Sequence, residues 1–148
     1  MKYVEVSYII FVKKSVKQLP VLKKRKLSTK QRNFRHFTVG DIGEKVAKAF
    51  LVRKGYTIIT NNVVFKKYEI DIVALDTNSD ELVFVEVKTR KSTNYGNPSQ
   101  SVSKRKLRSL KKGAQFFLRY TGLQNFYRFD IIAITPGRVE HFENITWP

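Results

Sequence analysis

The sequence feature that most limits the fold is a pair of apolar, strand-like segments that carry charged residues. Segment 82–88 reads Leu-Val-Phe-Val-Glu-Val-Lys, so Glu86 and Lys88 lie on one face of a strand and the valines on the other. Segment 69–75 places Asp71 on the face opposite its two flanking isoleucines. Burying a carboxylate among apolar side chains is costly unless a partner compensates its charge. We therefore expect a sheet whose charged residues face a partner.

A polar turn between these segments predicts an antiparallel hairpin. The turn, residues 76–80, reads Asp-Thr-Asn-Ser-Asp. Centring it between its third and fourth residues pairs positions whose numbers add to 157, so Asp71 faces Glu86 and Glu69 faces Lys88. Opposed carboxylates repel each other unless a cation lies between them, and hard divalent ions take oxygen ligands. The register predicts Mg²⁺ or Mn²⁺ at Asp71 and Glu86, with a lysine beside them that can orient a water or stabilise charge on phosphorus.

The same residues also allow a simpler interpretation. Glu69 and Lys88 can form an ordinary cross-strand salt bridge, and Glu-x-Lys occurs by chance in many proteins. The context favours a nuclease-like site, because a helix with an acid, Glu44, at the margin of its buried face precedes the hairpin, and a basic helix follows it.

Hydrophobic periodicity predicts an α/β protein with the order helix, three strands, helix and one or two strands. The first helix should bury an apolar stripe formed by Ile42, Val46, Ala49 and Phe50. The long helix should bury Leu107, Leu110, Ala114, Phe117 and Leu118, with its bases on the other side. The predicted elements are helix 41–54, strands 56–65, 69–75 and 81–89, helix 101–120, strand 127–134 and a short edge strand 139–142.

Charge points to an anionic partner. The chain has 29 basic and 12 acidic residues, a net charge of +17, and such a field attracts phosphate backbones. Residues 1–36 hold eleven bases and one acid and are expected to be a flexible basic extension, with residues 37–148 as the folded domain. No apolar run reaches the roughly 18 residues of a membrane span, and cysteine is absent, so we expect a cytoplasmic protein. A membrane-surface protein that uses the basic extension is a weaker alternative.

Several motifs together resemble the YraN family of uncharacterised bacterial proteins, from about Gly40 to the C-terminus. They are Gly43-Glu44, Arg53-Lys54-Gly55-Tyr56, Glu69-Ile70-Asp71-Ile72-Val73-Ala74, Val83-Phe84-Val85-Glu86-Val87-Lys88-Thr89-Arg90, Tyr95-Gly96, Val102, Lys106, Ala114 and Arg128-Phe129-Asp130-Ile131-Ile132-Ala133.

The resemblance implies the PD-(D/E)XK fold, a restriction-endonuclease-like core with a mixed central sheet flanked by helices, similar to archaeal Holliday-junction resolvases. Asp71, Glu86 and Lys88 match the D…E-x-K signature, and Glu44 matches the acid on the first helix that helps to hold a metal or its water. One departure is Tyr68, where family members often have glycine, and this residue could crowd the hairpin.

The sequence thus predicts a metal-dependent, endonuclease-like protein that acts on nucleic acid, DNA more readily than RNA. The alternative is a non-catalytic nucleic-acid-binding module on the same fold, and a homodimer is left open. Arg128 is a further candidate for phosphate contact, whereas Asp130 is expected to be structural and His36 and His141 to have no role. The expected catalytic residues are Glu44, Asp71, Glu86 and Lys88, the metal ligands Asp71, Glu86 and Glu44, and the nucleic-acid contacts Arg90, Lys104, Lys106, Arg108, Lys111 and Lys112.

Overall fold

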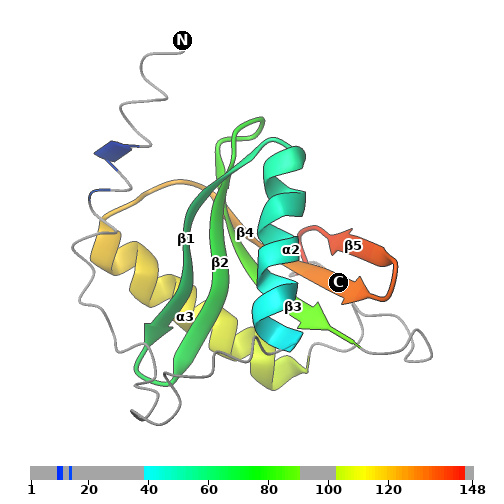
Figure 1. The fold of residues 1–148 in the computed structure, drawn as a ribbon. Helices are drawn as coiled ribbons and strands as arrows, with labels where there is room; N and C mark the ends of the chain where they lie inside the picture. Colours follow the sequence, from blue (N-terminus) through cyan, green and yellow to red (C-terminus); the bar gives the residue numbers. More distant parts are fainter. Residues whose placement is uncertain (1–9, 12–13, 15–38, 91–102, 146–148) are drawn as a thin grey trace, which may run out of the picture.

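The computed structural model describes residues 10–11, 14, 39–90 and 103–145, whose core is a five-stranded sheet between two helices (Figure 1). The predicted extension, residues 1–36, lies almost wholly outside these ranges. No helix within them is long and apolar enough to cross a membrane. The elements are α2 (Val39–Arg53), β1 (Tyr56–Phe65), β2 (Tyr68–Asp76), β3 (Glu81–Thr89), α3 (Lys104–Thr121), β4 (Tyr127–Thr135) and β5 (Arg138–Phe142).

The sheet is mixed and follows the predicted element order. Its strands lie in the order β1-β2-β3-β4-β5, and only β3 and β4 pair in parallel among the neighbours in the described sheet. A parallel pair needs a crossover connection, and α3 lies in the chain between these two strands. The arrangement confirms the predicted restriction-endonuclease-like core.

The two faces of the sheet carry separate hydrophobic clusters. Phe84 and Leu75 pack with Phe117 and other residues of α3, whereas Ile72 and Val85 pack with residues of α2. Strand β3 is therefore buried on both faces, which explains its unbroken apolar run from Leu82 to Val85, and each such side chain contributes roughly 1.5–3 kcal/mol by leaving water. Tyr68 does not crowd the hairpin, because its ring stacks on that of Phe116 of α3 with centroids 5.9 Å apart.

Helix α2 docks through a different face from the one predicted. Ile42, placed in the buried stripe, is 53% exposed, whereas Gly43, Ala47 and Leu51 are buried. A Cβ atom added to Gly43 would overlap the side chain of Thr89 at the end of β3. The helix thus lies closest to the sheet at Gly43 and Ala47, which have little hydrophobic signal in the sequence, and it also buries Leu51. The predicted stripe was wrong at Ile42 and Ala49, which are exposed, whereas Phe50 is partly buried and packs against the cluster beneath α2.

The β2–β3 hairpin has the predicted register. Paired residues add to 157 from Ile72–Val85 to Asp76–Glu81, next to the turn. Described pairing with β2 stops at Val85, although β3 continues to pair with β4 as far as Thr89. The two strands therefore separate at the level of Asp71 and Glu86.

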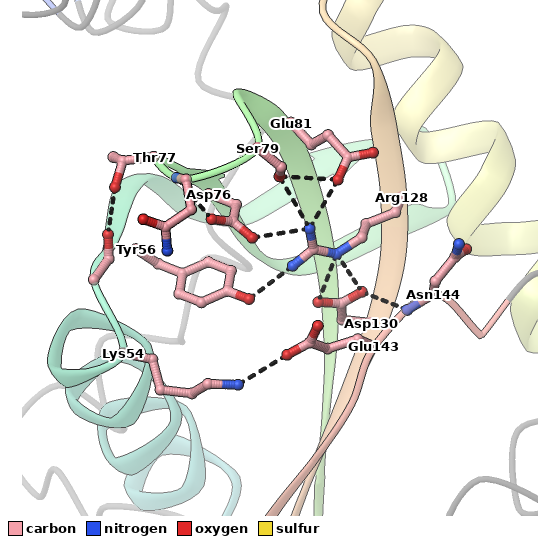
Figure 2. Close-up of polar contacts among 12 residues, drawn as sticks. Lys54, Tyr56, Asp76, Thr77, Ser79, Glu81, Arg128, Asp130, Glu143 and Asn144 are labelled. Atoms are coloured by element: carbon pink, nitrogen blue, oxygen red, sulfur yellow. Dashed lines mark hydrogen bonds and ion pairs between the residues drawn. The ribbon is translucent and has the colours of Figure 1, made fainter.

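The turn end of the hairpin is held by buried charges (Figure 2). Arg128 of β4 donates through Nη1 to Asp76 and Glu81, both at 3.0 Å, and through Nε to Asp130. Its Nη2 donates to the hydroxyl of Tyr56 at 2.7 Å. Burial opposes the charge of the guanidinium, but the surrounding acids outweigh burial and raise the pKa of Arg128. The side chain that the sequence offered as a phosphate contact is held instead by three carboxylates.

Because α2 lies close against β3 at Gly43, this glycine should be hard to replace. An alanine inside a helix normally adds about 1 kcal/mol of stability over glycine, but here the new methyl would overlap Thr89. We expect Gly43→Ala to lower the free energy of unfolding by about 1–2 kcal/mol in urea melts. Thr89→Ala in the same chain should restore part of this loss, as a coupled pair requires. A stabilised Gly43→Ala protein would contradict the close packing of α2 on β3.

Candidate active site

The predicted site residues meet at one end of the sheet. Figure 1 shows the first turns of α2 and α3 at the same end as the arrowhead of β3. A pocket of about 370 Å³ opens there, and all four predicted catalytic residues line it. The described residues around it are Val39, Gly40, Glu44, Asp71, Glu86, Val87, Lys88 and Thr89.

Asp71 lies where the alternation of side chains in β2 changes phase. Ile70 belongs to the cluster beneath α3, whereas Ile72 belongs to the cluster beneath α2, although strict alternation would place both on one face. Opposite Asp71 on β1 lies Asn62, whose φ of 54° is in the left-handed region that asparagine tolerates. This irregularity turns Asp71 toward the gap between β2 and β3, where its Oδ2 accepts a hydrogen bond of 2.7 Å from the Val87 N–H.

Two carboxylates of the pocket, those of Asp71 and Glu44, are held in environments that oppose their charge. Burial raises the pKa of Asp71 to about 6, the charge of Glu86 adds to this, and the Val87 N–H opposes it. Burial also raises the pKa of Glu44, although a hydrogen bond with the Asn62 side chain partly offsets it. Such shifted acids in a pocket are typical of functional sites.

Glu86 is the most buried acid of the pocket and is paired with two lysines. Its exposed fraction is 3%, its Oε1 lies 2.9 Å from Lys88 Nζ, and its Oε2 lies 3.0 Å from Lys106 Nζ. Burial alone would lower the pKa of Lys106, but the Glu86 carboxylate beside it raises that pKa. Lys106, predicted as a nucleic-acid contact, therefore belongs to the site itself. The Glu-x-Lys alternation showed Lys88, but the sequence carries no signal that turns a lysine of α3 inward.

The acids of the pocket suit a divalent ion that keeps part of its water shell better than an ion ligated wholly by protein. Within residues 39–90 and 103–145, no three acidic or histidine side chains lie close enough together to hold an ion. Mg²⁺ often binds through only one or two carboxylates, with waters and substrate phosphate completing its shell. Asp71 and Glu86 fit this requirement, since they share the pocket and Glu86 Oε2 receives no well-directed hydrogen bond from the described residues. Glu44 lines the same pocket and fits a role through water.

The remaining predicted nucleic-acid contacts lie outside the pocket. Arg90 follows the end of β3, where its backbone N–H donates to Ile134 O, and its side chain is half-buried. The basic face of α3 is exposed as predicted, opposite the buried face that includes Leu110 and Phe117. This face consists of Lys104, Arg108, Lys111 and Lys112.

Comparison with known proteins agrees with the motifs. A family model described as "Uncharacterised protein family UPF0102" matches residues 43–134. A UPF0102 protein of Phocaeicola vulgatus is 40% identical over 117 residues, 76% of this chain and 95% of that protein. UPF0102 protein TTE1452 of Caldanaerobacter subterraneus subsp. tengcongensis is 44% identical over 98 residues, 66% of this chain and 79% of that protein.

Among solved structures, one titled "Crystal structure of SSO0001" is 24% identical, with a TM-score of 0.35. The match covers 72% of this chain and 50% of that chain, a likeness too weak to carry an argument.

Asp71 should give the metal-free protein a distinctive dependence on pH. Because folding raises the pKa of Asp71 from 3.8 to about 6, its contribution to stability is present below pH 3.8 and is lost as pH rises through 6. Asp71→Asn should remove this loss and be more stable than the wild type by about 3 kcal/mol at pH 7.5, with little difference at pH 3.5. Urea melts in EDTA measure this, with exposed Glu69→Gln as control. Parallel wild-type and Asp71→Asn profiles would contradict the burial of this charge.

Proposed function

The chain belongs to the uncharacterised protein family UPF0102, the YraN family that its motifs resemble, and we propose that it is a metal-dependent, endonuclease-like phosphodiesterase acting on nucleic acid, DNA in preference to RNA. The observation that carries this proposal is the pocket in which Asp71, Glu86 and Lys88 meet where two neighbouring strands separate. This family has a PD-(D/E)XK-like fold, and these residues match the signature of that superfamily.

Each residue of the pocket has a role in this proposal. Asp71 and Glu86 would hold Mg²⁺ or Mn²⁺, and Glu44 would assist through a water. A bound ion of this kind polarises phosphoryl oxygens and lowers the pKa of coordinated water. Lys88, whose side chain is 32% exposed and lies against Glu86, would position the attacking water and stabilise the negative charge that develops on the phosphate.

A second candidate is a nucleic-acid-binding module without catalytic activity. One observation favours it, because Lys88 and Lys106 together balance the charge of Glu86, so the site needs no metal to be stable. On this alternative the protein binds nucleic acid equally well with and without a divalent ion. The two candidates therefore differ in their response to Mn²⁺.

Metal-dependent cleavage is the direct test of the proposed function. We expect Mn²⁺ at a hundredfold excess over its Kd to raise the free energy of unfolding by roughly 2.7 kcal/mol. We also expect Mn²⁺ to support cleavage of at least one substrate in a panel of linear, forked, four-way and single-stranded nucleic acids. Asp71→Asn should weaken this stabilisation by Mn²⁺ and abolish cleavage. Lys88→Ala should keep or strengthen this stabilisation and lose cleavage, since an ammonium group does not ligate a cation and that of Lys88 competes with the cation for Glu86.

Arg53→Ala, exposed in the last turn of α2, is the control and should keep both the stabilisation and the cleavage. A wild-type protein that is indifferent to Mn²⁺, even with nucleic acid present, would overturn the catalytic proposal and leave the binding module.

The exposed basic face of α3 should contribute to binding through phosphate contacts. Each phosphate neutralised on duplex DNA adds about 0.9 to the slope of log affinity against log salt concentration. Replacing Lys104, Arg108, Lys111 and Lys112 with serine should therefore reduce this slope by up to about 3.6. Filter binding at several salt concentrations measures it, with Arg53→Ser/Arg138→Ser, two exposed bases of α2 and β5, as control. An unchanged slope would assign the face to solvent.

A further inference from the structure

We propose that Lys106 is an exchangeable counter-ion of the candidate site, which holds Glu86 in the metal-free protein and moves to the nucleic-acid phosphate when a divalent cation binds. The inference rests on the proposed metal-dependent function and deepens it. It makes Lys106 a positioning residue that couples the binding of metal to the binding of substrate, rather than one more basic contact on the surface.

The geometry leaves the lysine, not the glutamate, free to move. Lys106 is the third residue of α3, and its backbone is fixed because its N–H donates to Ser103 Oγ at 3.2 Å. Its Nζ lies 3.0 Å from Glu86 Oε2, yet its side chain is 32% exposed whereas that of Glu86 is 4% exposed. A flexible four-carbon stem on a fixed backbone, with its ammonium group at the pocket, can exchange one anion for another.

The contact itself differs from a permanent buried ion pair in the same protein. Glu86 Oε2 receives no well-directed hydrogen bond among the described residues, so Lys106 holds it by charge and proximity. Arg128, at the turn end of the hairpin, instead donates from Nε to both oxygens of Asp130 at 3.2 and 3.3 Å and is 9% exposed (Figure 2). Directed, buried bonds resist exchange, and the Lys106 pair lacks both properties.

The charge at the start of α3 supplies the driving force. Its first turn contains Lys104, Arg105 and Lys106 and no acid, and the positive end of the helix dipole adds to them. A cation is unfavourable at this helix end unless an anion lies near, and in the metal-free protein Glu86 is that anion. A divalent ion at Glu86 competes for the same oxygens and repels the ammonium group, so the released lysine needs another anion. A phosphate of the bound nucleic acid fits this need.

The test measures Mn²⁺ binding in the absence of nucleic acid. By titration calorimetry, Lys106→Gln, which keeps a hydrogen-bond donor and removes the charge, should bind Mn²⁺ roughly tenfold more tightly than the wild type, because one competing ion pair is lost. Arg119→Gln, exposed in the last turn of the same helix, is the control and should change the Kd by less than about twofold. Lys106→Arg keeps the charge and should stay close to the wild type.

A second readout follows the coupling. The wild type should bind a short DNA duplex more tightly in Mn²⁺ than in EDTA, and Lys106→Gln should lose roughly tenfold of that gain because metal binding then releases no lysine. Nitrogen-15 spectra of the wild-type lysine ammonium groups, with the Lys106 signal assigned from Lys106→Arg, should show that signal move on addition of Mg²⁺. This measurement holds even if Lys106→Gln fails to fold.

An unchanged or weakened Mn²⁺ affinity in folded Lys106→Gln, or a Lys106 signal indifferent to Mg²⁺ that does bind, overturns the exchange and leaves the proposed function intact. A wild-type protein that binds neither ion overturns both. A tighter Mn²⁺ complex together with weaker coupling to DNA supports the exchange.

Discussion

The buried guanidinium of Arg128 fixes the hairpin register on which the candidate site depends. It binds Asp76 and Glu81, the last pair before the turn, and also Asp130 on its own strand (Figure 2). A slip of one residue would move every side chain of a strand to the other face of the sheet. The five residue steps from Asp76 to Asp71 span roughly 17 Å, so a charge cluster at one end of the sheet sets which acids meet at the other.

Much of this geometry follows from short-range patterns in the sequence. The polar turn gave the register of the hairpin, and the alternation of β3 placed Glu86 and Lys88 on one face, because both depend only on neighbouring residues. Strands β1 and β3 have the predicted bounds for the same reason, since β-branched and aromatic runs end at recognisable turns. A local pattern therefore sufficed to bring Asp71, Glu86 and Lys88 to the same end of the hairpin, whereas the D…E-x-K signature came from the family resemblance.

The features that the sequence did not reveal all depend on contacts between distant elements. Gly43 docks α2 on β3 because it lacks a side chain, so hydrophobic periodicity cannot detect it. Lys106 lies among surface bases in the sequence and turns inward only because α3 begins beside Glu86. The phase change at Asp71 accompanies the left-handed Asn62 on the neighbouring strand. Each of these features moves a charged or small residue to a place that its own segment does not predict.

The pocket and the whole molecule have opposite charge, and this difference orders the steps of the proposed reaction. The chain carries a net charge of +17, a field that draws phosphate toward it. Among the described residues that line the pocket, Glu44, Asp71 and Glu86 are acids and Lys88 is a base, so with its acids ionised the lining opposes the entry of a phosphate. On the proposed function, a divalent cation would offset this negative charge and, on the exchange proposed for Lys106, would add a freed ammonium group. On the proposed function, the surface would gather nucleic acid with or without metal, and the metal-loaded site would be the form that accepts a phosphate for reaction.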